Sequence, residues 1–306
     1  MKKRGYLLLT MLLGTLVLSG CLFDASAQEK GEKHAPKTKT HALKSENVKA
    51  DPSVKRPKDN QVAQNKDTEA SKHSVNTAGW ITVKQKPAKL PILMYHSISS
   101  GNSLRVPAQE FRAEMKWLKD HGYYTLTPEE AYAVLTTDKK PKEKCVWITF
   151  DDGYGDNYKE AYPVLKDYGM KATIFMIGNL IGKHGHLTES QMQEMARHGI
   201  SIQSHTISHL ELNNMTAQRQ RDEMTKSKAL FDRMFHQNTI TLSYPVGRYN
   251  EATIGLADTS GYKMAVTTHP GPASRDQGLL TLHRVRISPG MSAQSFGRLV
   301  NLDNGE

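Results

Sequence analysis

The chain has 306 residues and a formal net charge of +10, with 41 lysines and arginines, 31 acidic residues and two cysteines. Two cysteines are too few for a disulfide-stapled framework, whereas the length is sufficient for one substantial α/β domain. A basic chain is a candidate for nucleic-acid binding, but the leader described next favours export. Outside the cell, anionic lipids and wall polymers are the available partners, so we expect no nucleic-acid partner.

Residues 1–20 are predicted to be a signal peptide. Three basic residues, Lys2 to Arg4, precede an apolar stretch that is too short to span a bilayer comfortably. The following Leu18-Ser19-Gly20-Cys21 resembles a bacterial lipobox, which implies a lipidated Cys21, an extracytoplasmic location and anchoring to the cell membrane. The alternative is an ordinary signal peptide with a chance cysteine at its end. The second cysteine, Cys145, is expected to be a small buried apolar residue without a disulfide partner.

Residues 21–87 are rich in lysine and small polar residues and show no helical or strand period, so they are predicted to form a disordered linker. A solvated spacer without a specific partner is the favoured interpretation. The folded domain is predicted over residues 88–306.

Apolar runs and helix signals alternate along this domain. Strands are predicted at Leu90 to Tyr95, Val146 to Phe150, Ala172 to Ile177, Ile200 to Gln203, Ile240 to Ser243, Tyr262 to Thr267 and Arg284 to Ile287. Helices are predicted at Pro107 to His121, from Thr127, up to Tyr168, from Thr188, at Thr216 to Phe235, at Asn250 to Ser260 and from Ser292. This alternation predicts a parallel sheet with right-handed crossovers. The sheet can be open or closed, and seven or eight strands in a little over 200 residues favour a (β/α) barrel, complete or incomplete.

Two adjacent carboxylates, Asp151 and Asp152, follow the central predicted strand and are followed by Gly153. Neighbouring side chains at a strand end diverge, so one carboxylate can bind a metal while the other stays free as a base. The alternative is a surface Asp-Gly turn that closes a hairpin.

His205 and His209 follow another predicted strand at a spacing of four residues. If the chain is helical there, both imidazoles lie on one face and can bind one ion; the alternative is a solvated loop. Because the carboxyl ends of parallel strands meet at one rim, the Asp pair and the His pair are expected to lie together. Two histidines and one aspartate are a sufficient catalytic ligand set.

The stretches Thr149-Phe150-Asp151-Asp152-Gly153-Tyr154 and Ser204-His205-Thr206-Ile207-Ser208-His209 resemble the first two motifs of the NodB-type polysaccharide deacetylases, carbohydrate esterase family four. The resemblance implies a distorted (β/α) barrel that hydrolyses acetyl groups on a sugar polymer. It also implies that Asp152, His205 and His209 hold a divalent metal, with Zn²⁺ preferred over Co²⁺, Ni²⁺ or Fe²⁺, and that Asp151 is the general base.

The third motif of the family, Arg-x-Pro-aromatic-Gly, corresponds to Ser243-Tyr244-Pro245-Val246-Gly247. By analogy, this segment contacts the substrate and the Val246 N–H donates to the oxyanion. Ser243 replaces the Arg that pairs with the catalytic Asp, and whether Arg248 substitutes is left open. This change resembles the branch that acts on poly-β-1,6-N-acetylglucosamine. It predicts a raised pKa for Asp151, weaker alignment of its carboxylate, and slow turnover that increases with chain length.

The general acid has two candidates. His96 belongs to Met94-Tyr95-His96 on the first predicted strand, which matches a pair that opens many such domains, and His283 belongs to Leu282-His283-Arg284. The alternative for His283 is a residue that only precedes a strand.

We therefore predict a metal-dependent hydrolase that removes N-acetyl groups from an extracellular N-acetylglucosamine polymer, and that is monomeric. The preferred substrate is poly-β-1,6-N-acetylglucosamine, with peptidoglycan as the alternative. Competing classes are a lipoprotein that binds a glycan without cleaving it and one that scavenges metal. The intact Asp151 argues against the first, since a binding protein needs no base beside the ligands.

Overall fold

The computed structural model describes residues 75–301, and the description below concerns this part of the chain. The signal peptide, the lipobox with Cys21 and most of the linker lie outside the described residues, so they stay predictions. Within residues 75–301, none of the helices combines the length and the apolar composition needed to cross a bilayer.

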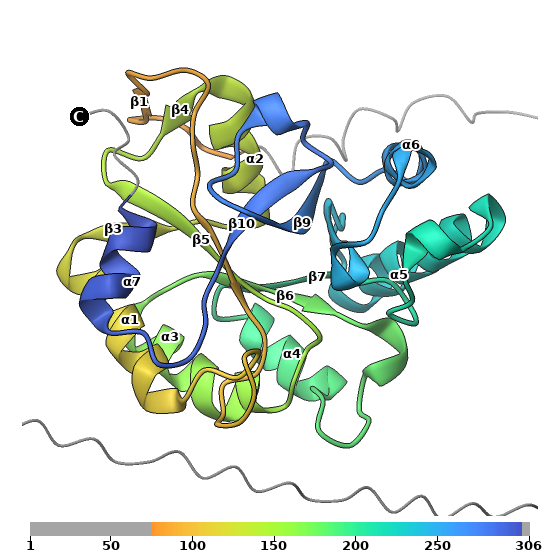
Figure 1. Ribbon diagram of the computed structural model, residues 1–306, viewed down its shortest axis with the longest axis horizontal. Coiled ribbons are helices and arrows are strands. Elements are labelled where there is room, and N and C mark those ends of the chain that lie inside the picture. The colour runs from red at the N-terminus through yellow and green to blue at the C-terminus, as the bar shows by residue number, and fades with distance from the viewer. Residues whose placement is uncertain (1–74, 302–306) are drawn as a thin grey trace, which may run out of the picture. The chain divides into compact units, whose positions relative to one another are not determined.

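Strands and helices alternate along the described residues (Figure 1). The strands are β1 (Ile81–Thr82), β2 (Ile92–Tyr95), β3 (Tyr123–Thr125), β4 (Lys139–Lys140), β5 (Lys144–Phe150), β6 (Ala172–Met176), β7 (Ile200–Ser204), β8 (Thr241–Ser243), β9 (Met264–Pro270) and β10 (Leu282–Arg286). The α-helices are α1 (Ala108–Asp120), α2 (Pro128–Thr137), α3 (Tyr162–Tyr168), α4 (Glu189–Ala196), α5 (Ala217–Phe235), α6 (Glu251–Thr259) and α7 (Ala293–Val300).

Seven of the strands form a ring of parallel pairs in the order β2, β10, β9, β8, β7, β6 and β5, and β5 pairs back with β2. Strand β3 adds to this sheet by pairing with the first half of β5. Figure 1 shows the helices around the outside of the ring. The predicted distorted (β/α) barrel is therefore confirmed, although several strands are only three to five residues long and the ring is not a regular barrel.

Local sequence explains why the elements begin where they do. The hydroxyl groups of Thr127 and Thr188 each accept the backbone N–H three residues later, from Glu130 and Gln191, whose side chains bond back to the cap. These two capping boxes confirm the predicted helix starts. Strand β5 is apolar and buried along nearly its whole length. One of its faces points into the barrel and the other packs against helices, so neither face meets solvent.

Ordered structure begins earlier than the sequence indicated. Residues 75–87 belong to the predicted linker, yet β1 lies in this segment and pairs antiparallel with β4. The side chains of Trp80 and Val83 pack against an apolar cluster that includes Trp147 of β5. A two-residue strand is too short to show an alternating pattern, so no local pattern predicts β1.

A carboxyl group is buried in the core beside the strand that leads to His96. Glu114 of α1 has no exposed surface. Its Oε2 accepts a hydrogen bond from the Tyr95 hydroxyl at 2.8 Å. Its Oε1 has no hydrogen-bond partner in the described part of the chain. Burial raises the pKa of Glu114 to about 8, although the bond from Tyr95 acts in the opposite direction. The folded protein therefore holds a proton that the unfolded chain releases at lower pH.

We predict that Glu114→Gln stabilises the protein, and more so at pH 9 than at pH 6. The wild type should lose up to about 1.4 kcal/mol of unfolding free energy per pH unit between about pH 4.5 and pH 8, because its folded-state pKa is raised. The amide cannot ionise, so the variant avoids this loss. Urea unfolding at several pH values measures the effect, with the exposed Glu160→Gln as the control. Parallel pH profiles for wild type and variant would contradict the prediction.

Candidate active site

The two carboxylates at the end of β5 are separated by a sharp turn. Asp151 and Asp152 are 3% and 8% exposed, and both Asp152 and Gly153 have left-handed backbones, with φ of 71° and 73°. A side chain at Gly153 would collide with the sulfur of Met176, so only glycine fits. The turn sends Asp151 and Asp152 in different directions, as predicted from their adjacency.

The histidine pair lies on a loop after β7, not on a helix as the spacing suggested. Thr206 and His209 have left-handed backbones, with φ of 65° and 54°, which bring His209 back towards His205. The buried Glu223 of α5 holds this loop, because its Oε2 accepts the N–H groups of Ile207 at 3.1 Å and Ser208 at 2.7 Å. A tight turn therefore produces the convergence that we expected from a helical face.

Asp152, His205 and His209 come together with ligand atoms that lie within 4.8 Å of one another. The Nε2 atoms of both histidines are 3.4 Å from Asp152 Oδ1. In a tetrahedral zinc site with bonds of about 2.1 Å, neighbouring ligand atoms are about 3.4 Å apart, so these residues fit such an ion. The His209 side chain is 31% exposed, which leaves one side of the triad open to solvent. An open position distinguishes a catalytic metal site from a structural one.

A second contact orients His205. Its Nδ1 lies 2.7 Å from the carbonyl oxygen of Ser243, so the Nδ1–H donates there and Nε2 is left for a metal. Burial alone would raise the pKa of Asp152, but the hydrogen bond and charge of His205 outweigh it and lower that pKa. The carboxylate of Asp152 is thus ionised, which is the form that binds a metal.

Arg284 of β10 is the partner of Asp151. Its Nη1 and Nη2 donate to Asp151 Oδ1 and Oδ2 at 2.8 and 2.6 Å, and the Arg284 side chain is fully buried. The rest of the guanidinium is also bound: Nε donates to the carbonyl of Thr267, and Nη2 also donates to the hydroxyl of Ser243 at 3.1 Å. A bidentate pair of this kind fixes both the position and the plane of the carboxylate.

This pair corrects the expectation drawn from the altered third motif. We expected Asp151 to lack an Arg partner and to have a raised pKa. Burial does act to raise the pKa of Asp151, but the charge and hydrogen bonds of Arg284 hold it well below its usual range. Arg248 is exposed and does not supply this contact. The predicted weak alignment of the base was therefore wrong, and slow turnover no longer follows from it.

Of the two candidate acids, His96 lies beside Asp151. Its Nε2 is 3.9 Å from Asp151 Oδ2. Burial lowers the pKa of His96, while the charges of Asp151 and Asp152 oppose this shift. The ring of His283 instead lies beside that of His269, with 5.4 Å between the centroids. The pKa of His283 is lowered, mainly by burial and secondly by the charge of His269. No contact between His283 and the metal-binding residues is found in the described structure.

The segment Tyr244 to Gly247 holds an unusual backbone next to the site. Val246 has φ of 57° and is 53% exposed, although a branched side chain disfavours this conformation. A side chain at Gly247 would collide with Thr268 of β9, and Tyr244 and Pro245 are buried. Tight packing on both sides thus keeps Val246 in a strained conformation at the surface.

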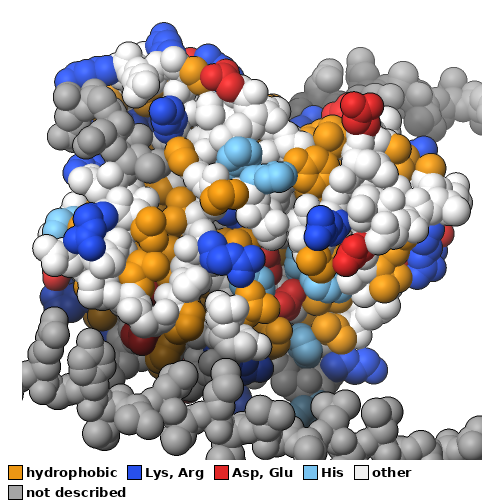
Figure 2. Space-filling view, viewed as in Figure 1, with side chains coloured by type: hydrophobic (Ala, Val, Ile, Leu, Met, Phe, Trp, Pro, Cys, Tyr) orange, Lys and Arg blue, Asp and Glu red, His pale blue; other side chains and the backbone are white. Residues whose placement is uncertain are grey.

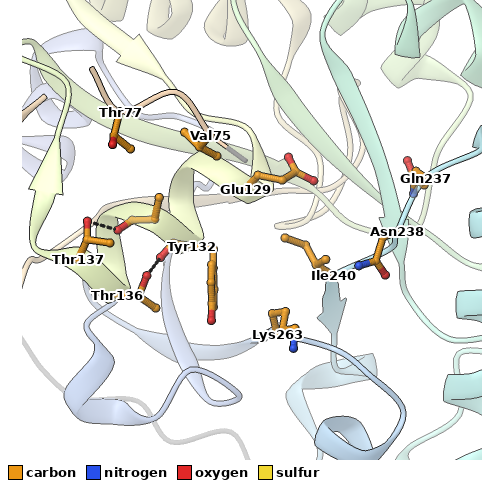
Figure 3. Close-up of a pocket in the computed structure, with 11 residues that line it drawn as sticks. Val75, Thr77, Glu129, Tyr132, Thr136, Thr137, Gln237, Asn238, Ile240 and Lys263 are labelled. Carbon is orange, nitrogen blue, oxygen red and sulfur yellow. Dashed lines mark hydrogen bonds between the residues drawn. The ribbon is translucent and has the colours of Figure 1, made fainter. Parts of the chain in front are cut away.

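The face in Figure 2 carries histidine side chains close to acidic ones near its middle, with apolar side chains around them. A cavity of about 460 Å³ lies elsewhere (Figure 3). Its lining includes Tyr132 of α2, together with Ile240 and Lys263, which precede β8 and β9. Strands begin at that end of the barrel, whereas the triad follows strand ends, so the cavity is not part of the candidate active site.

Comparisons with known proteins agree with this arrangement. The family model for polysaccharide deacetylase matches residues 138–265. The chain is 67% identical over 235 residues to the Bacillus subtilis protein named putative polysaccharide deacetylase YxkH, covering 77% of this chain and 84% of that protein. It resembles the solved Streptococcus pyogenes deacetylase PplD in complex with acetate, with a TM-score of 0.69 and 42% identity, covering 71% of this chain and 100% of that one.

A more distant relative carries a more specific name. The poly-β-1,6-N-acetyl-D-glucosamine N-deacetylase of Staphylococcus epidermidis is 28% identical over 242 residues, which cover 73% of this chain and 83% of that protein. The barrel carries an Asp-His-His triad that could hold a metal ion, with the buried Asp151 beside it. This chain belongs to the polysaccharide deacetylase family, and it is an enzyme of that class.

We predict that Arg284→Met lowers the free energy of unfolding by about 3–5 kcal/mol, because it leaves the buried Asp151 carboxylate without its partner. Arg284→Lys should recover only part of the loss, since an ammonium cannot form the bidentate contact. Urea unfolding measures both, and Arg286→Met, at an exposed position of the same strand, is the matched control. Equal stability of Arg284→Met and Arg286→Met would show that the ion pair contributes nothing.

Proposed function

We propose that this enzyme removes N-acetyl groups from an extracellular polymer of N-acetylglucosamine, with poly-β-1,6-N-acetylglucosamine as the preferred substrate. The observation that carries the reaction type is the set of three metal-binding side chains beside a carboxylate fixed by Arg284. The acetate in the related streptococcal structure supports it, because acetate is the product of such a hydrolysis. The substrate preference rests on the name of the staphylococcal relative and on the altered third motif.

Asp152, His205 and His209 would hold the divalent ion. When bound, such an ion lowers the pKa of a coordinated water and polarises the acetyl carbonyl. Zn²⁺ is the favoured ion because two imidazoles and one carboxylate, with a position left open, are a ligand set typical of catalytic zinc.

Asp151 acts as the general base in this scheme. Arg284 keeps its carboxylate ionised and fixed in plane, so the carboxylate is ready to take a proton from the attacking water. The Val246 N–H is proposed to donate to the oxygen of the acetyl group as negative charge develops there. The strained, exposed backbone at Val246 supports this role, since strain is retained at functional sites when packing enforces it.

His96 is proposed to return a proton to the leaving amine. Its Nε2 lies near Asp151 Oδ2, the oxygen that accepts from Arg284 Nη2. The lowered pKa of His96 makes its protonated form a stronger acid. His283 is less suited because its ring lies beside that of His269 and bonds to the backbone of Pro270.

We predict that Asp151→Asn reduces acetate release by at least about 100-fold and leaves the metal content unchanged, because the amide cannot accept the proton. Asp152→Ala should lose metal and activity together. Elemental analysis after dialysis and acetate release measure the two properties. The Asn variant also leaves Arg284 unpaired, so a lower unfolding temperature is expected and assays belong well below it. Turnover near the wild-type rate in Asp151→Asn would exclude the base role.

The substrate proposal predicts faster acetate release from poly-β-1,6-N-acetylglucosamine than from peptidoglycan, chitin oligomers or acetylated xylan, at equal acetyl concentration. Metal-loaded wild type is compared with Asp151→Asn to subtract non-enzymatic release. Faster release from peptidoglycan would replace the preferred substrate with the wall polymer. Measurable binding to a glycan with no acetate release from any of the four would instead support a non-catalytic binding protein.

A further inference from the structure

The backbone that carries His96 is tied to the loop that carries the base. Asn157 is fully buried, and its Nδ2 donates to the carbonyl oxygen of His96 at 2.8 Å. Asp156 accepts the N–H of Ile98 on Oδ1 at 2.9 Å and the hydroxyl of Ser97 on Oδ2 at 2.6 Å. Two adjacent side chains therefore bind three consecutive residues, beginning with His96 itself.

The same segment is also held from its other side. The N–H of Asp151 donates to the carbonyl of Tyr95 at 2.9 Å, as part of the pairing between β2 and β5. His96 is thus bracketed by bonds to Tyr95 before it and to Ile98 after it. All of the groups that make these bonds come from residues 151–157, which also supply the base and one metal-binding side chain.

An ordinary helix-capping role does not account for Asp156. It occupies the N-cap position of a π-helical turn, η1 (Asn157–Ala161), where an Asp side chain usually accepts an N–H of the following helix. Its side chain makes no such bond, and its two oxygens bind Ile98 and Ser97 instead. A single π-helical turn is rare, and such turns occur frequently at functional sites.

We propose that Asp156 and Asn157 are positioning residues that hold His96 at the distance from Asp151 needed for proton delivery to the leaving amine. This inference rests on the proposed role of His96 as the general acid. It assigns the two residues no contact with substrate. Their effect is transmitted through the carbonyl of His96 and the backbone of Ser97 and Ile98.

The test compares two substrates that differ in their need for a general acid. An amide needs a proton on its leaving amine, whereas 4-nitrophenyl acetate releases a stable phenolate without one. Asp156→Ala should lower kcat for de-N-acetylation by about 10-fold or more, with KM nearly unchanged, because general acid catalysis contributes about 10²–10⁴-fold. Its hydrolysis of 4-nitrophenyl acetate and its metal content should stay within about twofold of wild type, and Asp156→Asn should recover part of the amide activity.

Two comparisons complete the design. Asp167→Ala, at an exposed position of α3, is the matched control and should leave both activities unchanged. In the His96→Ala background, Asp156→Ala should cause little further loss on the amide, because the group that it positions is absent.

Equal loss on ester and amide, or a full additional loss in the double variant, would overturn the positioning role. Unchanged amide turnover in His96→Ala would remove His96 as the acid, and the positioning role with it. Activity on amide and ester that is absent even in wild type would instead contradict the proposed deacetylation itself.

Discussion

Arg284 and Asp151 form an ion pair that is closed off from solvent, and its two halves are 133 residues apart in the sequence. Both charges have left water, so either one alone would be strongly destabilising. The pair is tolerated because every oxygen of the carboxylate and every nitrogen of the guanidinium has a partner. The surroundings of Asp151 therefore depend on the last strand of the barrel.

This dependence couples the chemistry to closure of the sheet. Strands β10 and β5 do not pair with each other, but β2 lies between them and pairs with both. Closing the ring through β2 brings the guanidinium of Arg284 to the carboxylate of Asp151. The same closure brings β8 into place, and the carbonyl of Ser243 at its end orients His205. Folding thus positions the proposed base and the proposed metal-binding triad together.

The sequence was sufficient for the barrel and for the residues of the triad because these features rest on local signals. Alternation of apolar runs and helix starts determines the element order, and short motifs directly after strands mark the rim. The mistaken expectations concern long-range contacts and backbone geometry. Nothing local distinguishes a helical from a looped His205 to His209, since the outcome depends on Glu223 and on two left-handed residues.

The sequence around Arg284 contains a local signal for a buried ion pair. Alternation along β10 puts Leu282 and Arg284 on the same face, and Leu282 is a core residue. An arginine on the core face of a strand needs a buried acidic partner. The carboxylate pair at the end of β5 supplies such a partner at the same rim. The absence of Arg at position 243 therefore indicates that the charge has moved to another strand of the barrel.

The position of this arginine also bears on the choice of acid. His96 is partly buried between the negative charge of Asp151 and the positive charges of Arg284 and His205, which act on its pKa in opposite directions. Burial is the largest of these effects and the pKa of His96 is lowered, so its imidazolium gives up a proton more readily than in water. An acid of this kind is effective only if its distance from the reacting centre is fixed. That requirement gives a physical reason for the bonds that Asp156 and Asn157 make to the backbone on which His96 stands.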